Sequence, residues 1–233
     1  MKNLNLLIVE GNPKSENENF KISGIPTHSE SLKESLRYYS NDLNIDVFNP
    51  CNEKNFDKII PKLEKYDGMI WVGSSLNIYN DCIEIKQQIS FMKECFKKIN
   101  KILAICWGMQ VAVTAAGGEV KKSIKGAHMG IANNIKINKN GLKHTLYRSK
   151  NQKFNSTAFN FDEVVKLHNG AKHLASNSIN KVQSIHFKSG VSEVWGLQYH
   201  HEITYHKMIT IIKFRSWLLY TSPSPREELI YSK

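Results

Sequence analysis

Cysteine is scarce in this sequence, and no two cysteines stand at a metal-binding spacing. The 233 residues include four cysteines, none in a Cys-x-x-Cys pair: Cys51, Cys82, Cys95 and Cys106. These spacings match no zinc site, and a chain this long with four scattered cysteines is not a disulfide scaffold. The cysteine content therefore predicts a reduced, cytoplasmic protein without a bound metal.

Long apolar runs are also missing. No stretch approaches the roughly 20 residues that are needed to span a bilayer. The apolar run at residues 4–9 is too short for the core of a signal peptide, and no cleavage site follows it. We therefore expect no membrane partner.

Positive charge is abundant, but the patterns that bind nucleic acid are absent. The formal net charge is +11. The lysines are scattered, and the sequence contains no basic helix face, zinc-finger spacing or arginine-aromatic motif. A solvated basic surface is the simpler interpretation, so we expect no nucleic-acid partner.

The first half of the sequence does contain an alternation of short apolar strands with helices. Strands are predicted at residues 4–9, 45–48, 68–72 and 102–105. Helices are predicted at residues 27–40, part of 53–66, 82–99 and 107–116, with a loop at 14–24. This alternation predicts an α/β fold with an open, mostly parallel sheet and helices on both faces.

The second half is turn-rich and has a different pattern. Strands are predicted at 131–137, 164–167, 182–187 and 194–198, followed by a closing helix at 204–219. We expect these strands to be antiparallel additions to the sheet. Residues 1–217 are predicted to form one domain, and residues 218–233, where two prolines follow the helix, an irregular tail outside it.

Cys106 stands where a buried strand is predicted to meet a helix. A nucleophile on such a turn needs small residues two positions before and after it, as Ala104 and Gly108 are. The start of the helix favours the reactive thiolate, and the N–H of Trp107 is placed to donate to an oxyanion. A buried structural cysteine can have the same local pattern, so this motif alone leaves both interpretations open.

A second motif lies at the end of the last predicted strand. A cysteine nucleophile needs a base that takes its proton and returns it to the leaving amine, and His200 fits that role. Glu202 can accept a hydrogen bond from the other ring nitrogen and orient the ring. The alternative for a lone histidine is a solvated surface residue, and His201 and His206 complete no metal-ligand pattern.

Together these motifs resemble those of class I glutamine amidotransferases. Cys-Trp-Gly-Met-Gln at 106–110 and Gly-Leu-Gln-Tyr-His-His-Glu at 196–202 follow the family's chain order of Cys, His and Glu. The sequence is most similar to the stand-alone relatives of the glutaminase domain of GMP synthase. The resemblance covers most of the chain, with further matching segments at 71–79, 115–118, 125–130 and 161–176.

The resemblance implies a thioester mechanism. Cys106 would attack the side-chain amide of glutamine, His200 would protonate the departing ammonia, and Glu202 would orient His200. Water would then hydrolyse the γ-glutamyl thioester. This half-reaction of the family requires no metal and no organic cofactor.

The resemblance also implies an oxyanion site and a substrate site. The backbone N–H groups of Gly73 (or Ser74) and Trp107 would hold the oxyanion. Ser74 and Gln110 would contact the substrate. Two positions depart from the family pattern: Ala104 replaces a glycine, and His201 replaces the proline of His-Pro-Glu. The second change removes a rigid turn residue and adds an imidazole that can compete with His200 for Glu202.

Three functions remain open at this point. The sequence contains no P-loop and no second large domain. The first hypothesis is therefore a glutaminase that releases ammonia for a separate synthetase subunit. The second is a γ-glutamyl hydrolase or peptidase that needs no partner, and the third is a catalytically idle regulatory binding module. The complete Cys106, His200 and Glu202 set argues against the third.

Overall fold

The computed structural model describes residues 3–53 and 55–221 of the chain. A nine-stranded sheet runs through it in the order β2-β1-β3-β4-β11-β10-β9-β6-β7. The strands of this sheet are β1 (Leu4–Val9), β2 (Leu43–Phe48), β3 (Gly68–Trp71), β4 (Lys101–Ile105), β6 (His128–Ile137), β7 (Lys153–Asn160), β9 (Lys172–Ser176), β10 (Ser184–Ser189) and β11 (Ser192–Leu197). A separate pair is formed by β5 (Glu119–Lys122) and β8 (Asp162–Lys166).

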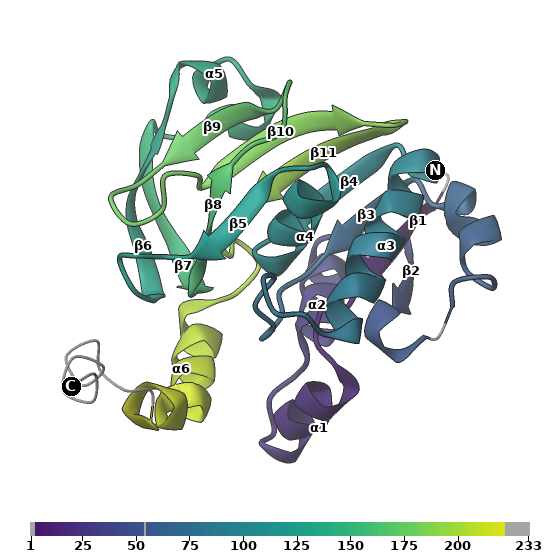
Figure 1. The fold of residues 1–233 in the computed structure, drawn as a ribbon, viewed down its shortest axis with the longest axis horizontal. Helices are drawn as coiled ribbons and strands as arrows, with labels where there is room; N and C mark the ends of the chain where they lie inside the picture. Colours follow the sequence, from purple (N-terminus) through teal and green to yellow (C-terminus); the bar gives the residue numbers. More distant parts are fainter. Residues whose placement is uncertain (1–2, 54, 222–233) are drawn as a thin grey trace.

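Helices lie on both faces of this sheet (Figure 1). They are α1 (Lys14–Ile22), α2 (His28–Tyr39), α3 (Ile83–Lys98), α4 (Trp107–Ala115), the short α5 (Lys139–Leu142) and α6 (Tyr205–Thr221). Three 3₁₀ turns complete the chain: η1 (Pro50–Asn52), η2 (Ile60–Lys65) and η3 (Thr145–Tyr147). No helix in the described residues is long and apolar enough to cross a membrane.

The sheet is parallel in one half and antiparallel in the other. β2, β1, β3, β4 and β11 pair in parallel, whereas β10, β9, β6 and β7 pair antiparallel. The predicted fold class is therefore confirmed, with β11 as the strand at which the two halves join. Because β11 is parallel to β4, the chain end that leads to His200 lies beside the chain end that leads to Cys106.

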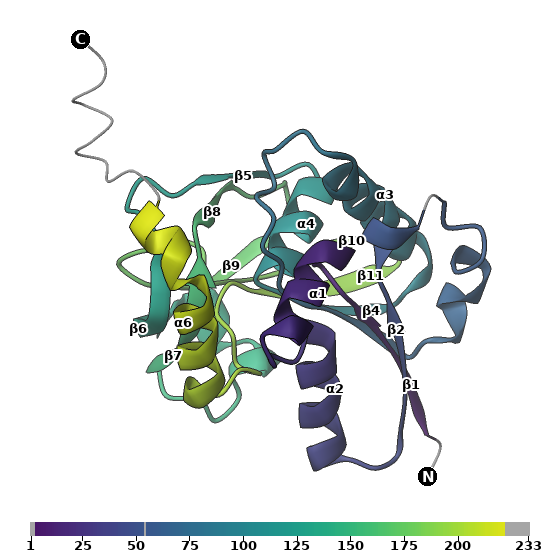
Figure 2. The same cartoon turned by 90° about the horizontal axis from the view of Figure 1, so that it is seen from below.

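Alternate residues of the parallel strands separate two hydrophobic layers. Leu7 and Val9 pack in the larger cluster with α3 and α4, while Ile8 packs with Leu32 of α2 on the other face. Figure 2 shows α2 and α3 on opposite sides of these strands. Burial on both faces explains why the strands have continuous apolar runs.

Several local predictions were wrong. Residues 14–24 are not a loop, because Lys14–Ile22 form α1; Phe20 is its one buried residue, so its sequence has almost no apolar periodicity. By contrast, the prediction that 53–66 is helical in part is confirmed, because η2 covers Ile60–Lys65 with Pro61 in its first turn. The strands β5, β7 and β9 were not predicted. The closing helix predicted at 204–219 is present as α6 (Tyr205–Thr221), and residues 222–233 of the predicted tail lie outside the described residues.

Candidate active site

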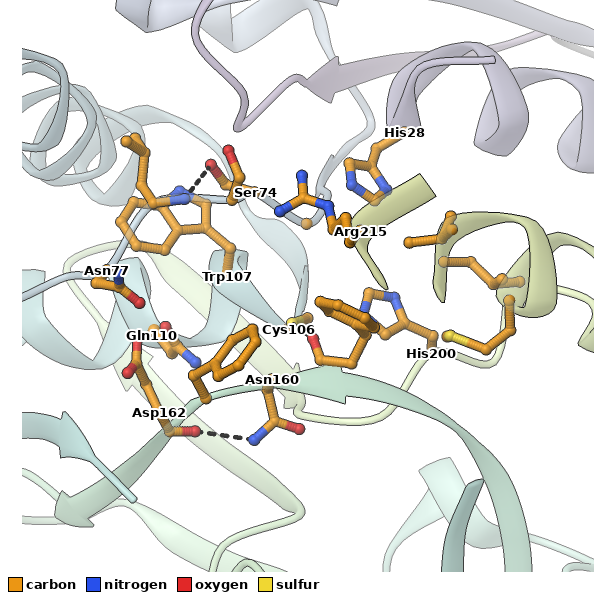
Figure 3. Close-up of a pocket in the computed structure, with 18 residues that line it drawn as sticks. His28, Ser74, Asn77, Cys106, Trp107, Gln110, Asn160, Asp162, His200 and Arg215 are labelled. Atoms are coloured by element: carbon orange, nitrogen blue, oxygen red, sulfur yellow. Dashed lines mark hydrogen bonds between the residues drawn. The ribbon is translucent and has the colours of Figure 1, made fainter. Parts of the chain in front are cut away.

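Cys106 occupies a strained turn between β4 and α4 (Figure 3). Its φ of 52° and ψ of −104° are rare for a non-glycine residue and cost roughly 1–3 kcal/mol. Gly108 is required by packing, because a Cβ there would lie 2.5 Å from the carbonyl oxygen of Trp71. The Cys106 N–H donates to the carbonyl of Leu197 at 2.6 Å, which holds the turn against β11.

The Cys106 thiol has polar neighbours although the residue is only 5% exposed. The thiol lies 3.7 Å from the carbonyl oxygen of Phe159, and Nε2 of Gln198 donates to Sγ at 3.5 Å. The carbonyl of the same Gln198 side chain accepts from Nε2 of Gln110 at 3.4 Å. Gln198 is fully buried, and it links Cys106 to the predicted substrate-binding residue Gln110.

His200 and Glu202 form a buried pair beside Cys106. Nδ1 of His200 and Oε1 of Glu202 are 2.7 Å apart, and both side chains are almost completely buried. The N–H of His200 donates to the carbonyl of Thr157 at 2.8 Å, and the Thr157 hydroxyl donates back to the His200 carbonyl. β7 thus fixes the backbone that carries the imidazole.

The electrostatics of this pair favour a charged imidazolium. Burial lowers the pKa of His200, but the negative charges of Glu202 and Cys106, with hydrogen bonds to both, raise it well above its ordinary value. Burial raises the pKa of Glu202, but the charge and hydrogen bond of His200 outweigh burial and hold it low. An imidazolium next to the sulfur is ready to donate a proton to a leaving group.

His201 does not displace His200 from Glu202. Its Nδ1 is 3.8 Å from Oε2 of Glu202, and its side chain is 46% exposed. That distance is too long for a hydrogen bond. Oε2 of Glu202 has no hydrogen-bond partner within the described ranges, so His200 is the residue that engages this carboxylate.

The predicted oxyanion residues border the same pocket. Gly73, Ser74, Trp107 and Gln110 all line it together with Cys106 and His200. The Trp107 N–H is at the first position of α4, where no intrahelical acceptor exists. A Cβ on Gly73 would lie 3.3 Å from Cε1 of His200, so this backbone runs directly beside the imidazole.

Two buried amides hold the oxyanion elements in place. Oδ1 of Asn12, a fully buried residue after β1, accepts the N–H of Ser75 at 2.8 Å. Gln88 of α3 accepts from Nε1 of Trp107 at 2.7 Å and donates to the carbonyl of Gly11 at 3.0 Å. The loop after β3 and the start of α4 are therefore both tied to the segment after β1.

One side of the pocket is polar and acidic. Gln110 and Asp162 line it on the side of Cys106 away from His200 (Figure 3). Asp162 is 3% exposed, and its Oδ1 has no hydrogen-bond partner in the part of the chain that the structure describes. Burial raises the pKa of Asp162 to about 6, although a hydrogen bond to Tyr79 and the charge of Lys122 oppose this effect. A buried carboxylate with an oxygen free of hydrogen bonds among the described residues is suited to bind a cationic group.

The opposite side is apolar and basic. It is lined by Phe159, Ile203, Met208, Ile211, Arg215 and His28. The ring of His28, the first residue of α2, stacks at 6.4 Å on the ring of His200. Burial and the charges of His200 and Lys207 lower the pKa of His28 to about 3, so this second imidazole is neutral.

Sequence reasoning missed four residues of this site. Gln198 lay inside the recognised strand-end motif, two residues before His200. Asp162 was within a recognised segment but carried no role of its own. His28 and Arg215 left no local signal, because one begins an ordinary capped helix and the other is one of several cations in α6, with Lys207 and Lys213. Outside residues 1, 2, 54 and 222–233, no group of three His, Cys, Asp or Glu side chains is arranged to hold a metal ion.

Comparison with known proteins identifies a family whose members this chain resembles in sequence. The family model described as glutamine amidotransferase class-I matches residues 25–215. A γ-glutamyl-L-1-hydroxyisopropylamide hydrolase of a Pseudomonas species is 30% identical over 207 residues, which cover 88% of this chain and 69% of that protein. One subunit of the glutamine-hydrolysing GMP synthase from Sulfolobus acidocaldarius is 26% identical over 148 residues, 63% of this chain and 73% of that subunit.

A solved structure shows the same fold. The glutamine amidotransferase of Thermotoga maritima aligns with a TM-score of 0.65 at 16% identity, covering 97% of this chain and 88% of that one. The family match over residues 25–215 is consistent with the order of the strands and with the turn at Cys106. The chain belongs to the class I glutamine amidotransferases.

Proposed function

We propose that this protein hydrolyses γ-glutamyl amides, with Cys106 as the nucleophile, His200 as the acid–base and Glu202 as the residue that orients it. The observation that carries the proposal is the two-sided pocket around Cys106. An acidic, polar side suits the α-ammonium group of a glutamyl moiety, and apolar side chains in the lining offer a hydrophobic surface for a substituent on the amide nitrogen.

The glutamyl moiety is expected on the side of Asp162. Its α-ammonium group would pair with the carboxylate of Asp162, which otherwise has no cation close enough for an ion pair among the described residues. The Gln110 side chain, held by Gln198, would accept or donate a hydrogen bond to the same moiety. The γ-carbonyl would then lie over Sγ of Cys106.

The reaction has two steps. Cys106 attacks the γ-carbonyl carbon, and the N–H groups of Gly73 and Trp107 hold the oxyanion that forms. The C–N bond breaks as His200 gives its proton to the amine, which leaves a γ-glutamyl thioester on Cys106. His200 then takes a proton from water, the hydroxide attacks the thioester, and glutamate departs as the thiol recovers its proton.

The side chains of α6 favour a substituted amide over glutamine itself. Ile203, Met208 and Ile211 form a hydrophobic cluster, and all three line the pocket. Ammonia makes no use of an apolar wall, whereas an alkyl or amino-acid substituent buries its surface there. The activity for which the Pseudomonas relative is named, hydrolysis of a γ-glutamyl hydroxyisopropylamide, is of this kind.

The test measures glutamate release from a panel of γ-glutamyl amides and from glutamine. Wild type should hydrolyse at least one substituted amide, and Cys106→Ala should lose the activity by roughly 10⁴-fold or more. Cys82→Ala is the matched control, because Cys82 is a half-buried free cysteine that does not line the pocket. If wild type released glutamate from no γ-glutamyl compound, the idle binding module would replace the enzyme proposal.

A second candidate function is ammonia donation to a separate synthetase. It is supported by the similarity to the GMP synthase subunit of Sulfolobus acidocaldarius, a protein of comparable extent. Here glutamine would be the best substrate, and its slow hydrolysis would accelerate on adding the acceptor enzyme. Faster turnover of a substituted amide than of glutamine, without any partner, would decide against this candidate.

A further inference from the structure

Arg215 is a buried cation in the wall of the pocket. It projects from α6, is 8% exposed and lines the same pocket as Cys106. Its guanidinium lies 5.5 Å from the ring centre of Phe20 and 5.9 Å from that of Phe159. Two aromatic faces therefore hold the planar group in one orientation, and burial makes each of its hydrogen bonds stronger than on the surface.

Arg215 lies on the side of the pocket from which the amine must leave. His200 gives a proton to the departing nitrogen, so the leaving group is on the His200 side of Cys106. Figure 3 shows the Arg215 guanidinium between Ser74 and His28, on the opposite side of Cys106 from Gln110 and Asp162. The guanidinium thus faces whatever is attached to the amide nitrogen.

The guanidinium retains hydrogen-bonding capacity for a ligand. Nη2 of Arg215 donates to Oε1 of Glu16 in α1. Among the residues whose side chains the structure describes, 3–53 and 55–215, this guanidinium donates no other hydrogen bond, although Arg has five N–H donors. A second carboxylate can therefore bind at Nε or Nη1, and the neutral His28 ring can donate a hydrogen bond to the same group.

We propose that the amine released by this enzyme is an α-amino acid with an apolar side chain, and that Arg215 binds its carboxylate. The side chain packs on Ile203, Met208 and Ile211. The substrate class is then γ-glutamyl amino acids, and Arg215 is a specificity-determining residue. The assignment rests on the γ-glutamyl amide hydrolase proposed above.

The test compares two substrates that differ only in the carboxylate. They are γ-glutamyl-leucine and γ-glutamyl-isopentylamide, whose leaving amines share the same branched alkyl chain. Wild type should prefer γ-glutamyl-leucine in kcat/KM by about tenfold to a hundredfold, the range of one charge-assisted hydrogen-bond pair. Arg215→Gln should remove the preference by slowing γ-glutamyl-leucine alone. Arg148→Gln, which removes an exposed arginine, should leave the ratio unchanged.

Glu16→Gln provides a second variant that retains Arg215. It removes the carboxylate that competes for the guanidinium, so the KM for γ-glutamyl-leucine should fall while that for the neutral amide stays constant. Thermal unfolding of both variants verifies that they are folded. If Arg215→Gln does not fold, the response of Glu16→Gln decides, and an unchanged KM for γ-glutamyl-leucine then overturns the proposal.

The outcomes separate this proposal from the one on which it rests. Equal kcat/KM for both substrates in wild type, or equal losses for both in folded Arg215→Gln, overturns the role of Arg215 but leaves γ-glutamyl amide hydrolysis intact. Equal losses would mean that Arg215 binds the glutamyl moiety or supports the pocket. If wild type hydrolyses neither substrate nor any other γ-glutamyl amide, both proposals fail.

Discussion

The two sides of the pocket are built from different parts of the molecule. Gln110 and Asp162 lie on α4 and β8, next to the central sheet and its largest hydrophobic cluster. Arg215 lies on α6, whose Met208 and Ile211 form a small separate cluster with Ile203, and His28 begins α2, which covers the other face of the sheet. The side proposed for the glutamyl moiety is therefore part of the core, and the side proposed for the leaving group is an addition to it.

This difference has a functional consequence. The core side lies beside the largest hydrophobic cluster, so we expect it to determine what all substrates share. Side chains of α6 pack in a smaller cluster of their own, so we expect them to determine how substrates differ. Four substitutions test the comparison, starting with the one that should affect both sides equally.

His200→Asn should have the largest effect, because His200 serves every substrate. We expect kcat to fall by roughly 10⁴-fold for all γ-glutamyl amides, the upper range for loss of an acid–base group. The variant should remain folded, as measured by circular dichroism and thermal unfolding. A variant that failed to fold would identify His200 as a structural residue instead.

Glu202→Gln should have a smaller effect of about 10²-fold on kcat, since it removes orientation and charge but leaves the imidazole. Glu18→Gln, at an exposed position of α1, is its control. As with His200→Asn, the loss should be the same whatever the leaving group. A loss of activity confined to one class of substrate would mean that Glu202 contacts the leaving group.

The same variant should reveal the ion pair through the pH dependence of stability. The raised pKa of His200 stabilises the folded state fully below the unfolded value of about 6.5, and the effect is lost as pH rises through the folded pKa. The lowered pKa of Glu202 stabilises it above about 4.3, and the effect is lost as pH falls through the folded pKa. The difference in Tm between wild type and Glu202→Gln should therefore be greatest between about pH 4.3 and pH 6.5, the two unfolded-state pKa values. It should shrink as the pH becomes alkaline.

Asp162→Asn should weaken substrate binding through the glutamyl moiety alone, so the effect should not depend on the leaving group. We expect KM to rise about 30-fold for every γ-glutamyl substrate, with kcat changing less. In wild type, KM should also rise as pH falls below about 6, because protonation removes the charge that binds the α-ammonium group. The variant should lose this pH dependence, whereas Asp57→Asn, at an exposed position, should retain it. An unchanged pH profile would contradict this role of Asp162.

His28→Asn should have the smallest effect, of about threefold, and only on the ranking of leaving groups. His28 touches the side where the amine departs and stacks on His200 without sharing its hydrogen bond to Glu202. The ratio of kcat/KM for γ-glutamyl-leucine to that for glutamine is the measurement, with exposed His206→Asn as the control. An equal loss of activity with all substrates would mean that His28 supports the reaction itself and not the choice of leaving group.

The parts of this molecule that the sequence predicted are those with local signals. The turn at Cys106 requires Ala104 and Gly108 within four residues, and His200 and Glu202 stand two residues apart. The apolar strands of the parallel half are buried on both faces, so their hydrophobic runs are visible without tertiary information. Each of these features is encoded within a few neighbouring residues.

The parts that were missed depend on contacts between distant segments. Arg215 meets Glu16 across 199 positions of the chain, and Gln198 meets Cys106 across 92. β7 was missed because its central Asn and Ser residues interrupt the apolar alternation, and only pairing with β6 reveals it as a strand. Such long-range pairs leave no periodicity or spacing for a single sequence to display.

The hydrogen bond from the Cys106 N–H to Leu197 has a consequence for protein engineering. It joins Cys106 to the strand that leads to His200 three residues later, so the two residues proposed to react are held in one unit. The helix α6 begins after that unit ends, at Tyr205. Residues 203–221 can therefore be exchanged for the corresponding helix of a relative as a cassette. Such chimaeras should inherit the donor's preference for leaving groups while keeping the recipient's chemistry.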